Sequence, residues 1–245
     1  ASSLKRNAIG KFRSFAFENL DKAYRYYDAA LDMFESAGAF EMVAKCETAK
    51  LSCNKAKGDI EFSEAESNMQ KSNFEAAIKW YDSARAYYSC AKESDLKRKC
   101  EENIKICKQS LAKQYFETAN NSLEAKRYIE AIKNAEKAAE IFHDLMDFEM
   151  ESASNSIIKN VWRVQGDAKV EQGNALVAEN KFDEADRCYI DAKDFYKKIN
   201  DYKSRNICDE MIKNCQIAKG DYYCKLGDKS QEEYHYEEAR EYYYK

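Results

Sequence analysis

Nine cysteines and two histidines are the side chains of this sequence best suited to binding a metal or carrying redox chemistry. Six of the cysteines form pairs whose members stand seven residues apart, namely Cys46 with Cys53, Cys100 with Cys107, and Cys208 with Cys215. Seven residues are two helical turns, so each pair lies on one face of a helix. Zinc needs four ligands at closer local spacing, and neither His143 nor His235 falls in this register. We therefore expect buried structural cysteines, with no metal site and no cofactor.

The signatures of the common enzyme classes are absent from the sequence. It contains no glycine-rich phosphate loop, no G-x-S-x-G and no H-E-x-x-H. Its 44 acidic residues are dispersed among 40 Lys and Arg, so carboxylates on solvated helix faces are the expected interpretation. Pairing two of them as general acid and base would be arbitrary. We predict that the protein is not an enzyme and has no catalytic residues.

The composition predicts a helical chain in a reducing compartment. Among 245 residues there is no Pro and there are only seven Gly, so little interrupts a helix. The net charge of −4 is small and unsegregated, which argues against a nucleic-acid partner. No stretch approaches the roughly 20 apolar residues that span a bilayer, and no apolar signal core opens the chain. With scattered, odd-numbered cysteines, these features favour a cytoplasmic location.

The helices that carry the cysteines belong to a repeat of 54 residues. Large apolar residues recur at this interval at Leu20, Phe74, Tyr128, Phe182 and Tyr236. Three residues later the same interval finds Ala23, Ala77, Ala131, Ala185 and Ala239. The unit continues as Tyr, Ala and aromatic at offsets 7, 10 and 14, which keeps all five positions on one helical face. This pattern predicts a helix that packs against at least two neighbours.

Five of the seven glycines occupy only two repeat positions upstream of this stripe. Gly58, Gly166 and Gly220 share one position, and Gly173 and Gly227 share the other. Glycine costs about 1 kcal/mol relative to Ala inside a helix. Its placement in phase therefore predicts close helix crossing rather than loops.

Each unit should contain a long first helix and a shorter second one. We expect a first helix from about Tyr202 to Gln231, roughly 45 Å long at 1.5 Å per residue, and a second from near Phe182 to Ile199. Asn200-Asp201 and its repeat equivalent Met146-Asp147 would supply the turn and the N-cap. An alternative is three helices per unit, with a break near Gly166 or Gly220.

The segment 173–185, GNALVAENKFDEA, together with Tyr189 and Ala192, resembles the tetratricopeptide repeat (TPR). Similar copies lie at 119–138 and 65–84, although the unit has 54 residues where the family has 34, and no proline closes it. The resemblance implies an all-α, right-handed α-solenoid of helical hairpins with long first helices. It would form one domain over 1–245, in units of about 1–38, 39–92, 93–146, 147–200 and a partial 201–245. We expect a segment of a longer array, or a chain whose open end another chain covers.

By this resemblance, the first helices line a concave protein-binding groove. The apolar candidates for its lining are Phe62, Phe116, Val170 and Cys224, and the polar candidates are Glu66, Asn120, Asn174 and Asp228. The polar set could hydrogen-bond a peptide or a helix, whereas the apolar set could equally seal each long helix against its neighbour. Recognition of a chaperone's C-terminal carboxylate is not expected, because the flanking positions lack bases.

Two functions fit this architecture. The first is a non-enzymatic scaffold or adaptor that binds a peptide or helix of a partner protein on its concave face. The alternative is a structural or vesicle-trafficking component of a larger assembly that uses its convex face and ends, by similarity to the long helical hairpins of the SNAP group of vesicle-fusion adaptors.

Overall fold

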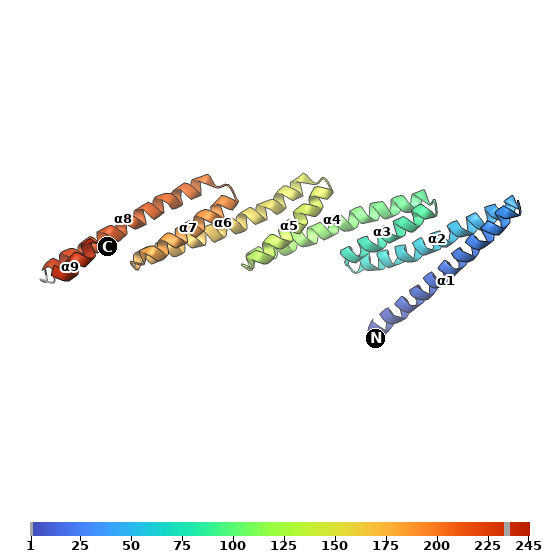
Figure 1. The fold of residues 1–245 in the computed structure, drawn as a ribbon, viewed down its shortest axis with the longest axis horizontal. Helices are drawn as coiled ribbons and strands as arrows, with labels where there is room; N and C mark the ends of the chain where they lie inside the picture. The colour runs from blue at the N-terminus through green and yellow to red at the C-terminus, as the bar shows by residue number, and fades with distance from the viewer. Residues whose placement is uncertain (1, 233–235) are drawn as a thin grey trace. The chain divides into compact units, whose positions relative to one another are not determined.

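The fold is described from a computed structural model, which covers residues 2–232 and 236–245 and the side chains of 13–231, 237 and 240–245. Within these residues the chain forms nine helices and no strand, so the all-α prediction is confirmed. The helices are α1 (Ser2–Ser36), α2 (Phe40–Gln70), α3 (Phe74–Cys90), α4 (Ser94–Glu124), α5 (Tyr128–Asp144), α6 (Phe148–Ala178), α7 (Phe182–Lys198), α8 (Tyr202–Glu232) and α9 (Tyr236–Tyr243) (Figure 1).

Long and short helices alternate, as the repeat predicts. Helices α2, α4, α6 and α8 each have 31 residues, and α3, α5 and α7 each have 17. Consecutive helices pack on one another, as α2 does on α3 and α7 on α8, which gives a solenoid of helical hairpins. The alternative of three helices per unit is wrong, because α6 and α8 run unbroken through Gly166 and Gly220.

The first helix departs from this alternation. Helix α1 has 35 residues and continues through positions 18 and 19, which are in phase with the loop at 72 and 73. A hydrogen bond from Lys22 Nζ to Glu18 Oε1, 2.7 Å long, bridges one helical turn at this point.

The chain forms two compact units by its internal contacts. One consists of Ala1–Tyr115 with Glu140–Phe148, and the other of Phe116–Ala139 with Glu149–Lys245. Each unit is described by itself below. The single domain of five repeat units stays a prediction.

The alanine stripe forms the core of both units. Ala77, Ala131 and Ala185 have no exposed surface. In the first unit the stripe of α3 packs against Cys100 and Cys107. In the second unit the stripe of α7 packs against Cys208 and Cys215. The predicted structural role of the paired cysteines is therefore confirmed.

The stripe is less covered in the first and last helices, which have one sequence neighbour each. Tyr27 and Tyr243 are exposed, although they are in phase with the buried Tyr81 and Tyr189. The predicted positions Tyr236 and Ala239 lie outside the described side chains.

The in-phase glycines allow tyrosine rings to lie directly on a long helix. A Cβ atom on Gly58 would stand 2.7 Å from Tyr88 Cε1, and one on Gly173 would stand 2.6 Å from Tyr189 Cε1. Gly166 and Gly227 are approached in the same way, so close crossing is confirmed at four positions. A Cβ atom on Gly220 would meet no atom of the described residues within 4 Å, so no close crossing is observed at that position.

The residue after each of these four glycines accepts a hydrogen bond from the tyrosine hydroxyl. Tyr88 donates to Asp59 at 2.8 Å, Tyr196 to Asp167 at 2.6 Å and Tyr189 to Asn174 at 2.8 Å, and Tyr243 donates to Asp228. Burial and the adjacent carboxylates raise the pKa values of Tyr88 and Tyr196 well above the usual range. The glycine and the hydrogen-bond acceptor that follows it thus together hold the tyrosine ring against the long helix.

Substituting two of these glycines with alanine should change stability in opposite directions. Gly173→Ala would place a methyl group against the buried Tyr189 ring, so we expect a net loss of about 1–2 kcal/mol after the gain in helix propensity. The added methyl group of Gly220→Ala would meet no atom of the part of the chain that the structure describes, so this variant should gain up to about 1 kcal/mol. Urea denaturation followed by circular dichroism measures both changes, and a stabilising Gly173→Ala would contradict the close approach.

Seven described loops end a helix with the same backbone geometry. One residue in each has a φ between 56° and 68°, namely Gly38, Ser72, Lys92, Lys126, Met146, Asn180 and Asn200. The next amide donates to the carbonyl five residues back, as Asp147 does to Phe142 at 2.9 Å, which is the Schellman motif. The predicted turns at Met146 and Asn200 are confirmed.

Asp201 caps helix α8, as predicted. Its carboxylate accepts hydrogen bonds from the Ser204 amide at 3.1 Å and from the Ser204 hydroxyl at 3.0 Å. The backbone hydrogen bond, with help from Arg163, lowers the pKa of Asp201.

Met146→Gly should stabilise the protein. A left-handed residue other than glycine costs about 1–2 kcal/mol, and glycine returns roughly half of that through the unfolded state, so we expect a net gain of about 0.5–1 kcal/mol. The Met146 side chain is exposed, so no packing is lost. The in-phase variant Gly38→Ala is the control and should lose a similar amount in the same denaturation experiment, whereas a neutral result at both positions would contradict the strain.

Candidate functional site

The predicted groove residues occupy the same two positions on successive long helices. Phe62 and Glu66 lie on α2 in the first unit. The members in the second unit are Phe116 and Asn120 on α4, Val170 and Asn174 on α6, and Cys224 and Asp228 on α8. All eight residues therefore lie on long helices, and their role in a groove stays a prediction.

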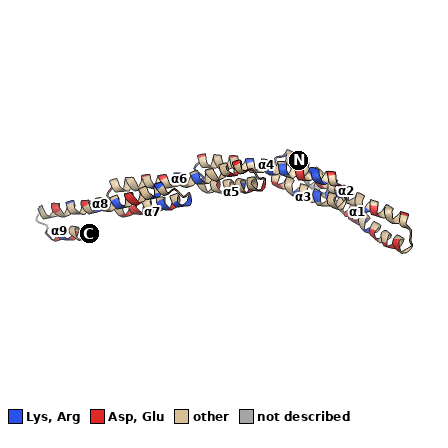
Figure 2. Ribbon diagram, turned by 90° about the horizontal axis from the view of Figure 1, so that it is seen from above, with Lys and Arg blue, Asp and Glu red and all other residues tan. Residues whose placement is uncertain are grey.

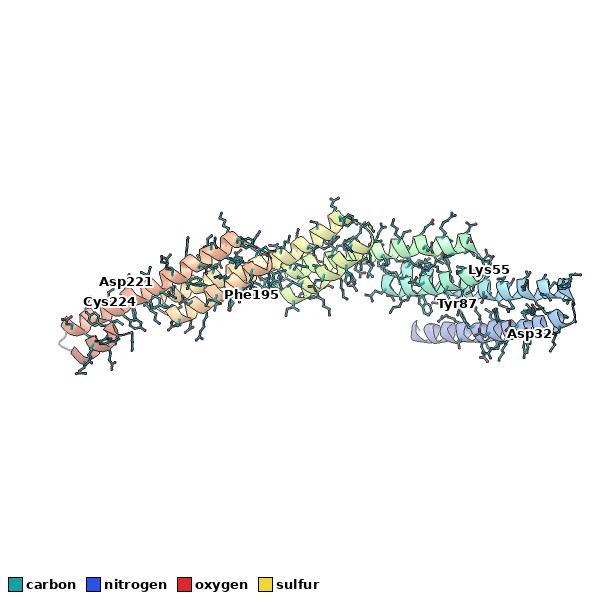
Figure 3. The ribbon with its side chains drawn as sticks, turned by 45° about the horizontal axis from the view of Figure 1, so that its top comes forward. Asp32, Lys55, Tyr87, Phe195, Asp221 and Cys224 are labelled. Carbon is teal, nitrogen blue, oxygen red and sulfur yellow. The ribbon has the colours of Figure 1, made fainter. Side chains whose placement is uncertain are left out.

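The apolar members pack into the hairpin cores. The ring of Phe62 meets that of Tyr81 edge-on at 5.2 Å. Phe116 packs against the cluster of Ala119 and Ala135, and Val170 packs against that of Ala192 and Tyr196. Cys224 is exposed on α8 (Figure 3). Three of the four thus take part in sealing a long helix against its neighbour.

Three of the four polar members are oriented by contacts within their own hairpins. Asn174 and Asp228 accept from tyrosine hydroxyls, and Asn120 donates its amide to the Phe116 carbonyl at 3.2 Å. Glu66, Asn174 and Asp228 nevertheless remain exposed. They form an ordered set of short polar groups on the long helices.

A second surface, which sequence reasoning missed, lies where α1 meets α2 and α3. Glu61 is 2% exposed and forms an ion pair with Arg13, whose Nη2 atom lies 2.5 Å from Glu61 Oε1. The buried Lys57 forms an ion pair with Asp21. Arg13 also lies over the Trp80 ring, 4.1 Å from its centre. The residues in phase with Lys57 are Leu111, Gln165 and Lys219, and those in phase with Glu61 are Tyr115, Lys169 and Tyr223. The apolar members Leu111, Tyr115 and Tyr223 could have identified an inward face.

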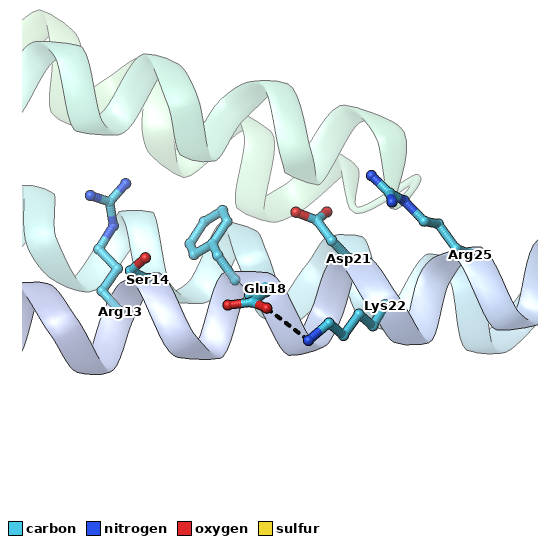
Figure 4. Close-up of a pocket in the computed structure, with 7 residues that line it drawn as sticks. Arg13, Ser14, Glu18, Asp21, Lys22 and Arg25 are labelled. Atoms are coloured by element: carbon cyan, nitrogen blue, oxygen red, sulfur yellow. Dashed lines mark hydrogen bonds and ion pairs between the residues drawn. The ribbon is translucent and has the colours of Figure 1, made fainter.

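The side chains that α1 contributes share one helical face. Arg13, Phe17 and Asp21 follow each other at intervals of four residues. Arg13 and Asp21 extend toward the neighbouring helices in Figure 4, whereas Glu18 and Lys22 pair along α1 itself. They line a cleft of about 610 Å³ with Arg25. Phe17 meets Tyr87 of α3 edge-on at 5.8 Å, and Figure 3 labels Tyr87 on this hairpin. Aromatic and ionic contacts therefore alternate along the interface.

Thiol chemistry is confined to two accessible positions. All nine cysteines are free, and only Cys90 and Cys224 are exposed. Burial raises the pKa of Cys100 and of Cys215 to about 11, and it also raises the pKa values of Cys53, Cys107 and Cys208. A thiolate is the reactive species, so the buried thiols should be inert in the folded protein.

Iodoacetamide at pH 8 should modify Cys90 and Cys224 in the native protein and all nine cysteines after unfolding in urea, as intact mass would record. Rapid modification of Cys100 or Cys208 without denaturant would contradict their burial.

The raised thiol pKa values also predict a dependence of stability on pH. The native state keeps these thiol protons to a higher pH than the unfolded state does, so unfolding releases protons and the free energy of unfolding should fall above about pH 9.

The surface charges are mixed. Acidic and basic residues are interspersed along the helices (Figure 2). No helix in the described ranges has an apolar stretch long enough to cross a membrane. Across the same residues, no group of three or more His, Cys, Asp or Glu is arranged to hold a metal ion.

Comparisons with known proteins add little. No protein-family model matches the chain, and no protein with a curated description matches it. A crystal structure of BtubC (BKLC) from P. vanneervenii is similar at 13% sequence identity, covering 86% of this chain and 92% of that chain, with a TM-score of 0.21. Function must therefore be inferred from the surfaces of the chain itself.

Proposed function

We propose that this protein is a non-enzymatic scaffold that holds a peptide or helix of a partner protein along its long helices, as its resemblance to the TPR family implies. The proposal includes a cytoplasmic location, which the free cysteines favour. Its main support is the way in which α2 and α3 hold α1.

The contacts of α1 illustrate how this fold can receive a helix. A cation, a ring and a carboxylate spaced by four residues meet Glu61, Tyr87 and Lys57. This spacing presents one face of a helix to the surface, as in helix-in-groove recognition. The paired charges set register and direction, while the rings supply buried apolar area.

The exposed polar groups of the long helices supply a second element of the proposal. Carboxylate and amide groups such as Glu66 and Asn174 can bind the backbone or side chains of a docked segment. Their tyrosine partners fix Asn174 and Asp228 before binding, which lowers the entropy lost when a ligand docks.

A retention experiment with charge-matched variants tests the proposal. The full chain would be immobilised and its partners identified by mass spectrometry, using the wild type, Glu66→Arg with Asp228→Arg, and a control with Glu136→Arg and Asp194→Arg. All four positions are exposed, and both double variants change the charge equally. We expect partners to be retained by the wild type and the control and lost from the groove variant. Equal retention by both variants would contradict binding along the long helices.

A structural or vesicle-trafficking role, through the convex face and ends, is the second candidate. The observation that favours it is an exposed aromatic residue opening three of the long helices, Phe40, Phe148 and Tyr202. Retention of SNARE proteins or an ATPase, abolished by changing these three residues to Ser but not by the groove variant, would favour this role over the scaffold.

A further inference from the structure

At one position of the repeat, a side chain makes a polar contact with the following long helix in three of the four copies compared. The residue after the first large apolar position of the repeat is Asp21, Glu75, Ile129 or Asp183. Asp21 pairs with Lys57, Glu75 accepts from the Tyr115 hydroxyl, and Asp183 pairs with Lys219 at 2.8 Å. A polar tie at this position is therefore the usual arrangement of the repeat.

The remaining place, between α5 and α6 in the second unit, breaks the pattern. Position 129 carries Ile instead of an acid, and its side chain is 86% exposed. Position 165, in phase with Lys57 and Lys219, carries Gln. The buried Oε1 atom of Gln165 receives no hydrogen bond from any described residue. An exposed Ile and an unsatisfied buried acceptor are both unfavourable, and here they stand at the positions where the other copies form a contact.

These two residues line a surface cleft of about 630 Å³. Its rim carries Lys126, Arg127 and Lys133, with Glu130 as the one acid. Arg127 pairs with Glu130 at 3.0 Å, so this acid is already occupied and the rim is net positive. Lys133 lies one turn after Ile129 on the same face of α5.

We propose that this cleft binds a linear segment of a partner protein in which an apolar side chain is flanked by carboxylates. The apolar side chain would cover Ile129 beside Gln165, and the carboxylates would meet Lys126 and Lys133 on the rim. The complementarity excludes basic segments, and the central Ile129 disfavours a bare anion such as phosphate. None of these residues belongs to the groove set, so the site does not depend on the function proposed above.

The repeat itself supplies a variant that closes the cleft. Ile129→Asp with Gln165→Lys reproduces the pair that Asp183 and Lys219 make in the next hairpin of the same unit. This variant should fold at least as stably as the wild type, because it removes an exposed Ile and an unpaired acceptor. A melting temperature no lower than that of the wild type would verify folding.

A phage-displayed library of random dodecapeptides is the probe. It would be selected on the full chain and counter-selected on the closed variant. We expect enriched sequences with an apolar residue flanked by Asp or Glu. By fluorescence anisotropy, such a peptide should bind about tenfold more weakly to the closed variant and to Lys133→Glu, and within about twofold of wild type to Lys79→Glu. Lys79 is the exposed, in-phase equivalent of Lys133 on α3, so it controls for net charge.

Several results would overturn the proposal. One is a selection in which no peptide distinguishes the wild type from the closed variant. Another is enrichment of sequences without the acidic and apolar pattern. A third is a concentration-dependent dimer of the wild type in sedimentation that the closed variant abolishes, since a second copy of the chain would then be the occupant.

Discussion

Tyr88→Ala is expected to lower the free energy of unfolding of the first unit by about 3–5 kcal/mol. The Tyr88 ring is buried against Gly58 of α2 and belongs to the cluster formed with Ala84 and Cys100. Removing it would leave a cavity bordered by backbone at Gly58, which cannot fill the space. Urea denaturation followed by circular dichroism measures the change, and a loss below about 1 kcal/mol would contradict the packing.

Tyr88→Phe separates the hydroxyl from the ring. It removes the hydrogen bond to Asp59 but leaves the ring on Gly58, so we expect a loss of only about 1–2 kcal/mol. The in-phase residue of the third copy is Phe142, which is buried without a hydroxyl. If Tyr88→Phe and Tyr88→Ala were equally destabilising, the hydroxyl and not the ring would carry the contact.

Arg13→Ala should destabilise the same unit by about 3 kcal/mol, because removing one partner of a buried pair leaves the other charge uncompensated. Glu61 has almost no contact with solvent, and Arg13 is its ion-pair partner. The variant also loses the cation–π contact with Trp80. Trp80 fluorescence in a Trp162→Phe background reports the local change, and the stability follows from urea denaturation.

The matched control replaces both partners with apolar residues of similar size. Arg13→Met with Glu61→Leu removes the two charges together, and its stability should lie within about 1 kcal/mol of the wild type. An Arg13→Ala variant as stable as the wild type, with unchanged Trp80 emission, would show that the pair does not hold α1 on α2 and α3.

Much of the fold could be predicted because the same pattern recurs in phase. The long helix predicted from Tyr202 to Gln231 ends one residue later, and the helix predicted from Phe182 to Ile199 ends one residue earlier. Such agreement arises because buried alanines, rings and cysteines recur with helical spacing, so local periodicity and tertiary packing favour the same structure.

The loops were harder to predict, because their left-handed residues are mostly not glycine. Lys92, Lys126 and Met146 take positive φ values, and none of them is a usual signal for a helix end. The identical backbone hydrogen bonds in each loop hold these residues in place. Only Gly38, Asn180 and Asn200 have residue types that suggest this conformation.

The functional surfaces were predicted only in part. The groove positions follow from the repeat. The contacts of Asn174 and Asp228 with tyrosines depend on how each following helix packs against the long helix, which the sequence pattern does not specify. Buried Lys57 and Glu61 depend on partners 36 and 48 residues earlier in the chain. The cleft at Ile129 could be predicted from the sequence only if the polar contacts of Asp21, Glu75 and Asp183 with the following long helices were already known.

Site-specific photocrosslinking tests the central claim most directly, namely that a partner docks along the long helices. A photoreactive amino acid would replace Glu66 or Asn174 on long helices, or Ile190 on the short helix α7, all of which are exposed. The account predicts that one partner is crosslinked from positions 66 and 174, through a defined segment, and not from 190. Crosslinking from position 190 alone, or no crosslink from either long-helix position, would contradict it.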